Sequence, residues 1–161
     1  MNEAKYNISG EDLVRDLLLV LRETFEGSPG DEGSIYLDRG VGVLSTLGSV
    51  SADHASFAFE GSTIAAHTEH LKFYVDRLIE FIEGRTAPVN WEDSWLIETV
   101  NEDEWAALRS SVERSYRSAV ERLAAVEEWK PDRIGEAMAI IAHSAYHFGA
   151  IRQMTKRVLP A

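Results

Sequence analysis

The chain has 161 residues, of which 45% are hydrophobic and 27% are charged, a composition typical of one globular domain with its own core. The formal net charge of -11 disfavours contact with a phosphate backbone, so nucleic acid is not expected as a partner. No cysteine is present, which excludes disulfides, a thiolate nucleophile and sulfur-ligated metal sites. Metal chemistry in this chain would therefore depend on histidine and carboxylate side chains.

Membrane association is not expected from the sequence. No apolar run approaches the ~20 residues needed to span a bilayer, and residues 1–10 lack the basic and apolar regions of a signal peptide. We therefore expect a single domain over residues 1–161 and a cytoplasmic location.

The first half of the chain predicts one long helix followed by irregular segments. Ser9 is placed to cap a helix that ends near Gly27. Residues 27–42 are rich in glycine and predict a long loop, after which a brief helical turn is expected over residues 43–49. Residues 51–61 are too short and too aperiodic to predict an element, so we interpret them as a connection.

The second half predicts three further helices. Residues 62–83 carry apolar side chains at helical spacing, and Gly84 is placed to end that helix. A third helix is expected to begin at Asn101, and a fourth to begin at Pro131 and end before Pro160. Four amphipathic helices with almost no strand-like alternation predict an all-α fold. The architecture indicated is an up-down four-helix bundle with a long loop between its first two helices.

Two histidines of the fourth helix are spaced to share a ligand. His143 and His147 are four residues apart, so their side chains lie on one side of a helix and one turn apart. Both fall on the apolar stripe with Ile140 and Ile151, and their ring nitrogens therefore need partners in the interior. Two imidazole lone pairs directed at one point form a helical metal chelate. A hydrogen-bonded pair of core histidines is the alternative.

The second helix offers a third imidazole from either of two residues. On a helical wheel His67 lies nearer the centre of the apolar stripe and His70 toward its edge, so periodicity alone slightly prefers His67 as the buried group. Either residue could be the third ligand. His54 falls in the expected connection beside Asp53, where a solvated side chain is expected.

A di-iron carboxylate bundle is not favoured, because that class of site needs Glu-x-x-His pairs. None of the residues three positions before a histidine is acidic. They are Ser51, Ile64, His67, Ile140 and Ser144.

Two segments carry a resemblance to a known family. Residues 145–153, with His143 ahead of them, resemble the last-helix signature of the DinB-like superfamily. Thr63 and Ile64, followed by the pair at 70–71, resemble its second-helix motif, in which the histidine before a leucine is the first metal ligand. The resemblance covers nearly the whole chain in helix order, and only these two segments are specific.

The resemblance implies a site as well as a fold. Family members are four-helix bundles with a three-histidine site for zinc, nickel or a similar divalent ion, and by that alignment the ligands here are His70, His143 and His147. His67 takes a place that many relatives fill with an apolar residue. Three histidines leave a position open on a tetrahedral ion, the arrangement of catalytic zinc sites, and such an ion activates water or a thiolate.

The resemblance also implies an activity class. Some relatives transfer or isomerise thiol adducts with low-molecular-weight thiols such as bacillithiol, mycothiol or glutathione. It therefore implies a metal-dependent thiol S-transferase or hydrolase that acts on a small-molecule substrate. The alternative is a non-catalytic bundle whose histidines serve stability or regulation.

Family members are often homodimers, and the apolar run over residues 17–21 also favours a homodimer, because one bundle interior cannot bury all of it.

No catalytic residue is indicated beyond the histidines. Tyr74, Tyr146 and Arg152 are weaker candidates for a proton donor or anion clamp, because their helical angles place them off the direction of the histidine pair or deeper along the bundle. The tryptophans in and near the connection between the second and third helices are expected to pack rather than to form a substrate cage. They are Trp91, Trp95 and Trp105.

Overall fold

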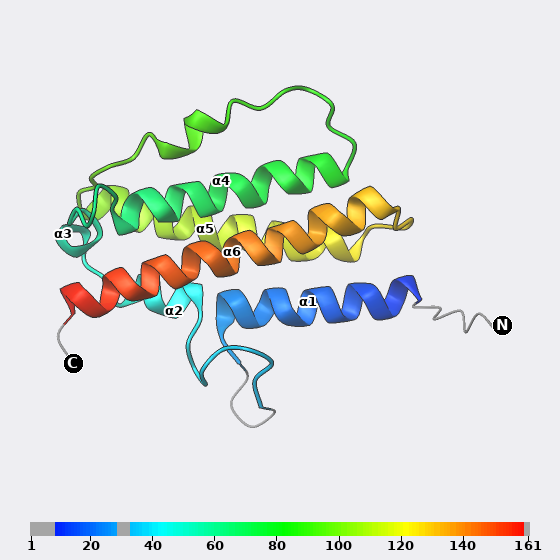
Figure 1. Ribbon diagram of the computed structural model, residues 1–161, viewed down its shortest axis with the longest axis horizontal. Helices are drawn as coiled ribbons and strands as arrows, with labels where there is room; N and C mark the ends of the chain where they lie inside the picture. Colours follow the sequence, from blue (N-terminus) through cyan, green and yellow to red (C-terminus); the bar gives the residue numbers. More distant parts are fainter. Residues whose placement is uncertain (1–8, 29–32, 160–161) are drawn as a thin grey trace.

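The computed structural model describes residues 9–28 and 33–159, and its regular elements there are helical, which confirms the all-α class. The helices are α1 (Gly10–Glu26), α2 (Val43–Gly48), α3 (Ala52–Ala55), α4 (Ile64–Ile82), η1 (Trp91–Trp95), α5 (Glu102–Ala124) and α6 (Pro131–Val158). Four of them are long and lie lengthwise beside one another (Figure 1). In the described part of the chain no helix is long and apolar enough to cross a membrane.

The long helices begin where the sequence places capping residues. The Ser9 hydroxyl accepts from the Asp12 amide, and Asn101 forms a reciprocal capping box with Glu104. Pro131 occupies the first turn of α6, where its missing N–H costs nothing. These local signals explain why helix positions agree with expectation to within the usual variation at helix ends. Helix α6 ends at Val158, before Pro160, and Pro160 itself lies outside the described residues.

The direction of the helices differs from the expected up-down order, in which every helix reverses the one before it. Here α4 and α5 run in the same direction (Figure 1). Where both begin, the Thr63 hydroxyl donates to the Glu98 carbonyl at 2.9 Å, and where both end, Arg122 pairs with Glu83. The cause is the connection 83–101, which is long enough to return along the length of α4, since extended chain covers ~3.3 Å per residue and helix only ~1.5 Å. This return places η1 against α4.

The core lies between the long helices. Trp105 is fully buried, and its indole nitrogen donates to the Val50 carbonyl at 2.7 Å, which ties α5 to the chain that leaves α2. Phe25 of α1 stacks on Tyr116 of α5 with ring centroids 4.7 Å apart. Helices α4 and α6 share the most extensive contact of any pair. That pair therefore forms the frame for the histidines.

The loop over residues 27–42 is closed at its two ends. A Cβ at Gly42 would lie 2.4 Å from the Gly27 nitrogen, so only glycine allows this approach. Gly27 itself has a φ of 87°, in the region that favours glycine. The glycines therefore let α1 end and the chain return to begin α2, which is the brief helical turn expected over residues 43–49.

A buried carboxylate organises the same loop from within α1. Glu23 accepts hydrogen bonds from the amides of Ile35, Tyr36 and Leu37 at 2.8, 3.0 and 2.8 Å. Burial alone would raise the pKa of Glu23, but the three amide donors offset it, and the net pKa is lowered. Glu23 therefore stays charged and holds the loop against the helix.

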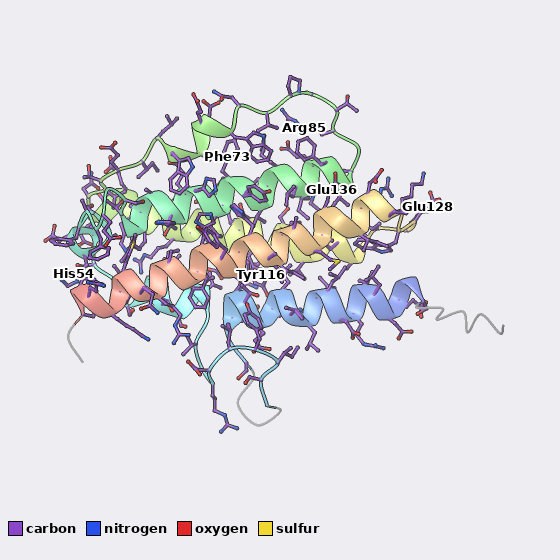
Figure 2. The ribbon with its side chains drawn as sticks, viewed as in Figure 1. His54, Phe73, Arg85, Tyr116, Glu128 and Glu136 are labelled. Carbon is purple, nitrogen blue, oxygen red and sulfur yellow. The ribbon has the colours of Figure 1, made fainter. Side chains whose placement is uncertain are left out.

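The expectation that residues 51–61 contain no element is wrong. Helix α3 forms there because the Ser51 hydroxyl accepts from the His54 amide at 3.3 Å and caps one short turn. His54 lies on α3 at one end of the molecule and is partly exposed (Figure 2). It is not part of the histidine group described next.

Candidate metal centre

Helices α4 and α6 bring three histidines into one group. His70 of α4 and His143 and His147 of α6 each offer a ring nitrogen, and these nitrogens lie within 4.8 Å of one another. The ring centroids are 4.4 to 4.9 Å apart. Two nitrogens on one tetrahedral zinc lie about 3.3 Å apart, given Zn–N distances of ~2.0–2.1 Å. The three rings could therefore hold one ion after small side-chain rotations.

Burial within the group differs from the helical-wheel expectation. His70 and His147 are buried, with 9% and 4% of their surface exposed, whereas His67 is only partly buried. The preference for His67 as the more buried residue is therefore wrong. The wheel could not include η1, which packs on α4 and covers His70.

Ser94 of η1 fixes the protonation of the His70 ring. The Ser94 hydroxyl donates to the Trp91 carbonyl at 2.5 Å, so its oxygen accepts from Nδ1 of His70, which lies 2.7 Å away. With the hydrogen on Nδ1, the lone pair of His70 is on Nε2 and is available to an ion. A partner of this kind orients a metal ligand in many known sites. Sequence reasoning missed Ser94, because no periodic pattern marks it.

His67 contacts the group through His147. The Nδ1 atoms of the two rings lie 2.8 Å apart, so one of them donates to the other. With His147 as the donor, its Nε2 lone pair is left for an ion and His67 acts as the acceptor. The three-residue group does not include His67, which therefore lies beside it as a supporting residue.

One ring nitrogen of the group is both fully buried and without a hydrogen-bond partner. Nε2 of His143 is buried and makes no hydrogen bond, while the ring stacks on Tyr74 with centroids 3.5 Å apart. A buried polar atom without a partner costs about 1–3 kcal/mol. A cation beside this lone pair would remove that cost, so the residues present fit a metal ion.

The three histidines of the group and His67 are all held in the neutral form, which is the form that binds metals. Burial, together with a smaller effect of neighbouring imidazoles, lowers the pKa of His143 to about 4 and that of His147 to about 3. Burial also lowers the pKa of His70 and of His67. At neutral pH no proton therefore competes with a metal for these lone pairs.

Comparisons with protein-family models, curated proteins and solved structures found no match. The candidate metal centre therefore rests on its own geometry.

Two tyrosines whose helical angles place them off the direction of the histidine pair or deeper along the bundle have ring contacts with it. Tyr74 stacks on His143, and Tyr146 meets His147 edge to face with centroids 5.0 Å apart. Arg152 does not join them, because it pairs with Asp38 at 3.2 Å. The long aromatic side chains reach further along the helix than their wheel angles indicate.

The tryptophans divide between packing and the site. Trp105 packs in the core as expected, and Trp91 lies against Tyr74 and Phe73. Figure 2 labels Phe73 on the side of α4 that faces η1. Trp95 stacks on His70 with centroids 4.1 Å apart and planes 19° apart. It is therefore a neighbour of the site that sequence reasoning assigned to packing alone.

Proposed function

We propose that this chain binds one divalent metal ion through His70, His143 and His147, within a four-helix bundle of the DinB-like kind. The observation that carries the proposal is the group of three histidine ring nitrogens within 4.8 Å of one another, and the buried, unpartnered Nε2 of His143 supports it. The resemblance of residues 145–153 and of the pair at 70–71 to the family's two signatures supports the same ligand set.

Zinc or nickel suits the donors, because neutral imidazole is a borderline ligand that both ions accept. An ion with three protein ligands supplies a Lewis acid with an open position. The chain's own residues would hold and orient that ion: Ser94 and His67 contact the rings of His70 and His147, and Trp95 and Tyr74 stack on those of His70 and His143. We propose a metal-dependent thiol S-transferase or hydrolase acting on a small molecule, with a low-molecular-weight thiol as cosubstrate in the first case.

The test of this activity class is a panel of thiol conjugates and esters assayed with the full chain. Turnover should disappear after chelator treatment and return when zinc or nickel is added back. The triple variant His70→Ala, His143→Ala, His147→Ala should remain inactive under both conditions. Turnover that survives chelation would contradict a metal-dependent enzyme.

A non-catalytic role is the second candidate, and the closed packing of the histidines favours it. Stacked aromatic rings cover His70 and His143, and cavities of about 610 and 630 Å³ border α1 at Glu23 and at Val14 instead. Under this alternative the triple variant keeps the protein's cellular function, and only its stability falls.

We also propose a homodimer, formed through α1. Leu17 and Leu21 face the core, whereas Leu19 between them is half exposed, so the helix presents apolar surface on a second side. Sedimentation equilibrium should give twice the chain mass of 18.0 kDa. A species of single chain mass at tens of micromolar would contradict the dimer.

A further inference from the structure

In the described part of the chain, the hydrogen-bond partners of the histidine group are uncharged. The hydrogen-bond partners of His70 and His147 are a serine hydroxyl and another imidazole, whereas metal-ligating histidines commonly donate to a carboxylate. Among the described residues, none of these histidines forms an ion pair or a hydrogen bond with a carboxylate. The surroundings therefore leave the charge of a bound divalent ion uncompensated.

An uncompensated divalent charge favours an anion at its open position. The ligand rings are largely buried, so the attraction between the ion and an anion is screened less than in water. A neutral ligand would leave the double positive charge in a site of low polarity, which is costly. A monoanion that fills the single open position reduces the net charge of the ion and its neutral ligands from +2 to +1.

The rim of the group is aromatic. The Trp95 ring centroid lies 4.1 Å from that of His70, 5.4 Å from His67 and 5.8 Å from His147, and 42% of Trp95 is exposed. Tyr146, 73% exposed, borders His147. These rings face both the histidines and solvent, so a ligand that approaches His70 and His147 from this rim packs against them. Flat apolar groups gain most from such a contact.

We infer that the loaded site binds a monoanion carried on a flat apolar body, such as an aryl carboxylate or an aryl thiolate. The inference rests on the proposed metal. The ion recognises the charge, and Trp95 is the specificity-determining residue that recognises the ring.

The test uses the full chain loaded with Co(II), whose visible spectrum reports a change in its ligands. Benzoate is compared with acetate, thiophenolate with ethanethiolate, and benzyl alcohol serves as the uncharged aromatic probe. The aryl member of each anion pair should bind about tenfold more tightly, which corresponds to ~1.4 kcal/mol, near the upper range of one aromatic contact. Benzyl alcohol should bind far more weakly than benzoate.

Variants in η1 and at the residue that follows it test whether Trp95 makes the contact with the ring of the ligand. Trp95→Ala should bring the benzoate to acetate ratio close to one, and Trp95→Phe should keep most of it. Leu96→Ala, which removes an exposed apolar side chain next in sequence, should leave the ratio unchanged. Quenching of tryptophan fluorescence by benzoate should disappear in Trp95→Ala only.

Two kinds of failure are distinguishable. A chain that takes up no Co(II) contradicts the proposed metal and, with it, this inference. A loaded chain that binds acetate or benzyl alcohol as tightly as benzoate, or whose ratio survives Trp95→Ala, contradicts the inference alone. If only one of the two anion pairs shows a preference for its aryl member, that pair identifies the anion as a carboxylate or as a thiolate.

Discussion

Nδ1 of His70 and the hydroxyl oxygen of Ser94 lie 2.7 Å apart, and this contact joins the connection between α4 and α5 to the candidate metal centre. Ser94 is fully buried, and its own hydrogen is committed to the Trp91 carbonyl. The ring orientation of His70 therefore depends on a 3-10 helix that is distant in sequence from α6. Metal affinity should depend on that helix as well.

Ser94→Ala is expected to weaken metal binding by roughly tenfold to hundredfold, because the acceptor that holds the Nδ1 hydrogen is lost. Competition with a chromophoric chelator measures the affinity. The NMR signal of the His70 Nδ1 hydrogen should broaden or vanish in the same variant. Ser110→Ala, at an exposed position of α5, should change neither. Equal affinities in the two variants would remove Ser94 from the site.

His70→Ala and His67→Ala are expected to differ. His70 belongs to the group of three ring nitrogens, so its loss should abolish tight binding. His67 only supports His147, so His67→Ala should keep most of its metal, with an affinity lowered by no more than the roughly tenfold to hundredfold expected when a supporting partner is lost. A metal titration of both variants side by side is the measurement, and equal or reversed losses would contradict the assignment.

The metal-free protein should lose stability as the pH falls below about 6.5. The pKa of His143 is lowered to about 4 and that of His147 to about 3, so in this window the unfolded chain takes up protons that the folded chain does not. The stability that the neutral rings contribute is fully present above pH 6.5, and it is lost as the pH falls toward 4 and 3. Between pH 6.5 and 4.5 the lowered pKa of Glu23 keeps its carboxylate charged in the folded chain, so Glu23 adds little to the decline in this window.

Thermal unfolding at a series of pH values checks this. The double variant His143→Leu, His147→Leu should show a flatter dependence between pH 6.5 and 4.5 than the natural chain. The same slope in both proteins would mean that these rings titrate normally.

Glu23→Gln is expected to destabilise the fold by about 1–3 kcal/mol, because a neutral amide accepts less strongly than the carboxylate and its NH₂ group faces amide donors. Urea unfolding measures the change. Glu11→Gln, at an exposed position of the same helix, should stay within about 0.5 kcal/mol of the natural chain. A loss confined to Glu23 would show that its three amide contacts hold the loop over residues 33–42.

The sequence predicts the parts of this molecule that local chemistry decides. Capping residues such as Ser9 and Asn101 lie next to the helices they begin, and the four-residue spacing of His143 and His147 is a property of one helix. The placement of these two histidines on the apolar stripe of their helix followed from the same helical periodicity. For this reason the helices and the α6 half of the site could be predicted without knowledge of the packing.

The rest depends on contacts between distant residues. The shared direction of α4 and α5 is decided by the path of the connection 83–101, which has no periodic pattern. The same path brings Ser94 and Trp95 onto His70, so neither residue could be assigned to the site from its own surroundings in the sequence. The error over the burial of His67 has the same origin, since a helical wheel does not show what covers each face.

The metal content of the purified protein tests the central claim most directly. The full chain, prepared without chelators and without nickel affinity resin, is analysed by plasma mass spectrometry beside His67→Ala and the triple variant of His70, His143 and His147. The natural chain should contain about one zinc or nickel ion, His67→Ala most of that amount, and the triple variant essentially none. A natural chain that is folded and metal-free, and that stays so when zinc and nickel are supplied, would contradict the metal centre and leave the histidines as a hydrogen-bonded core.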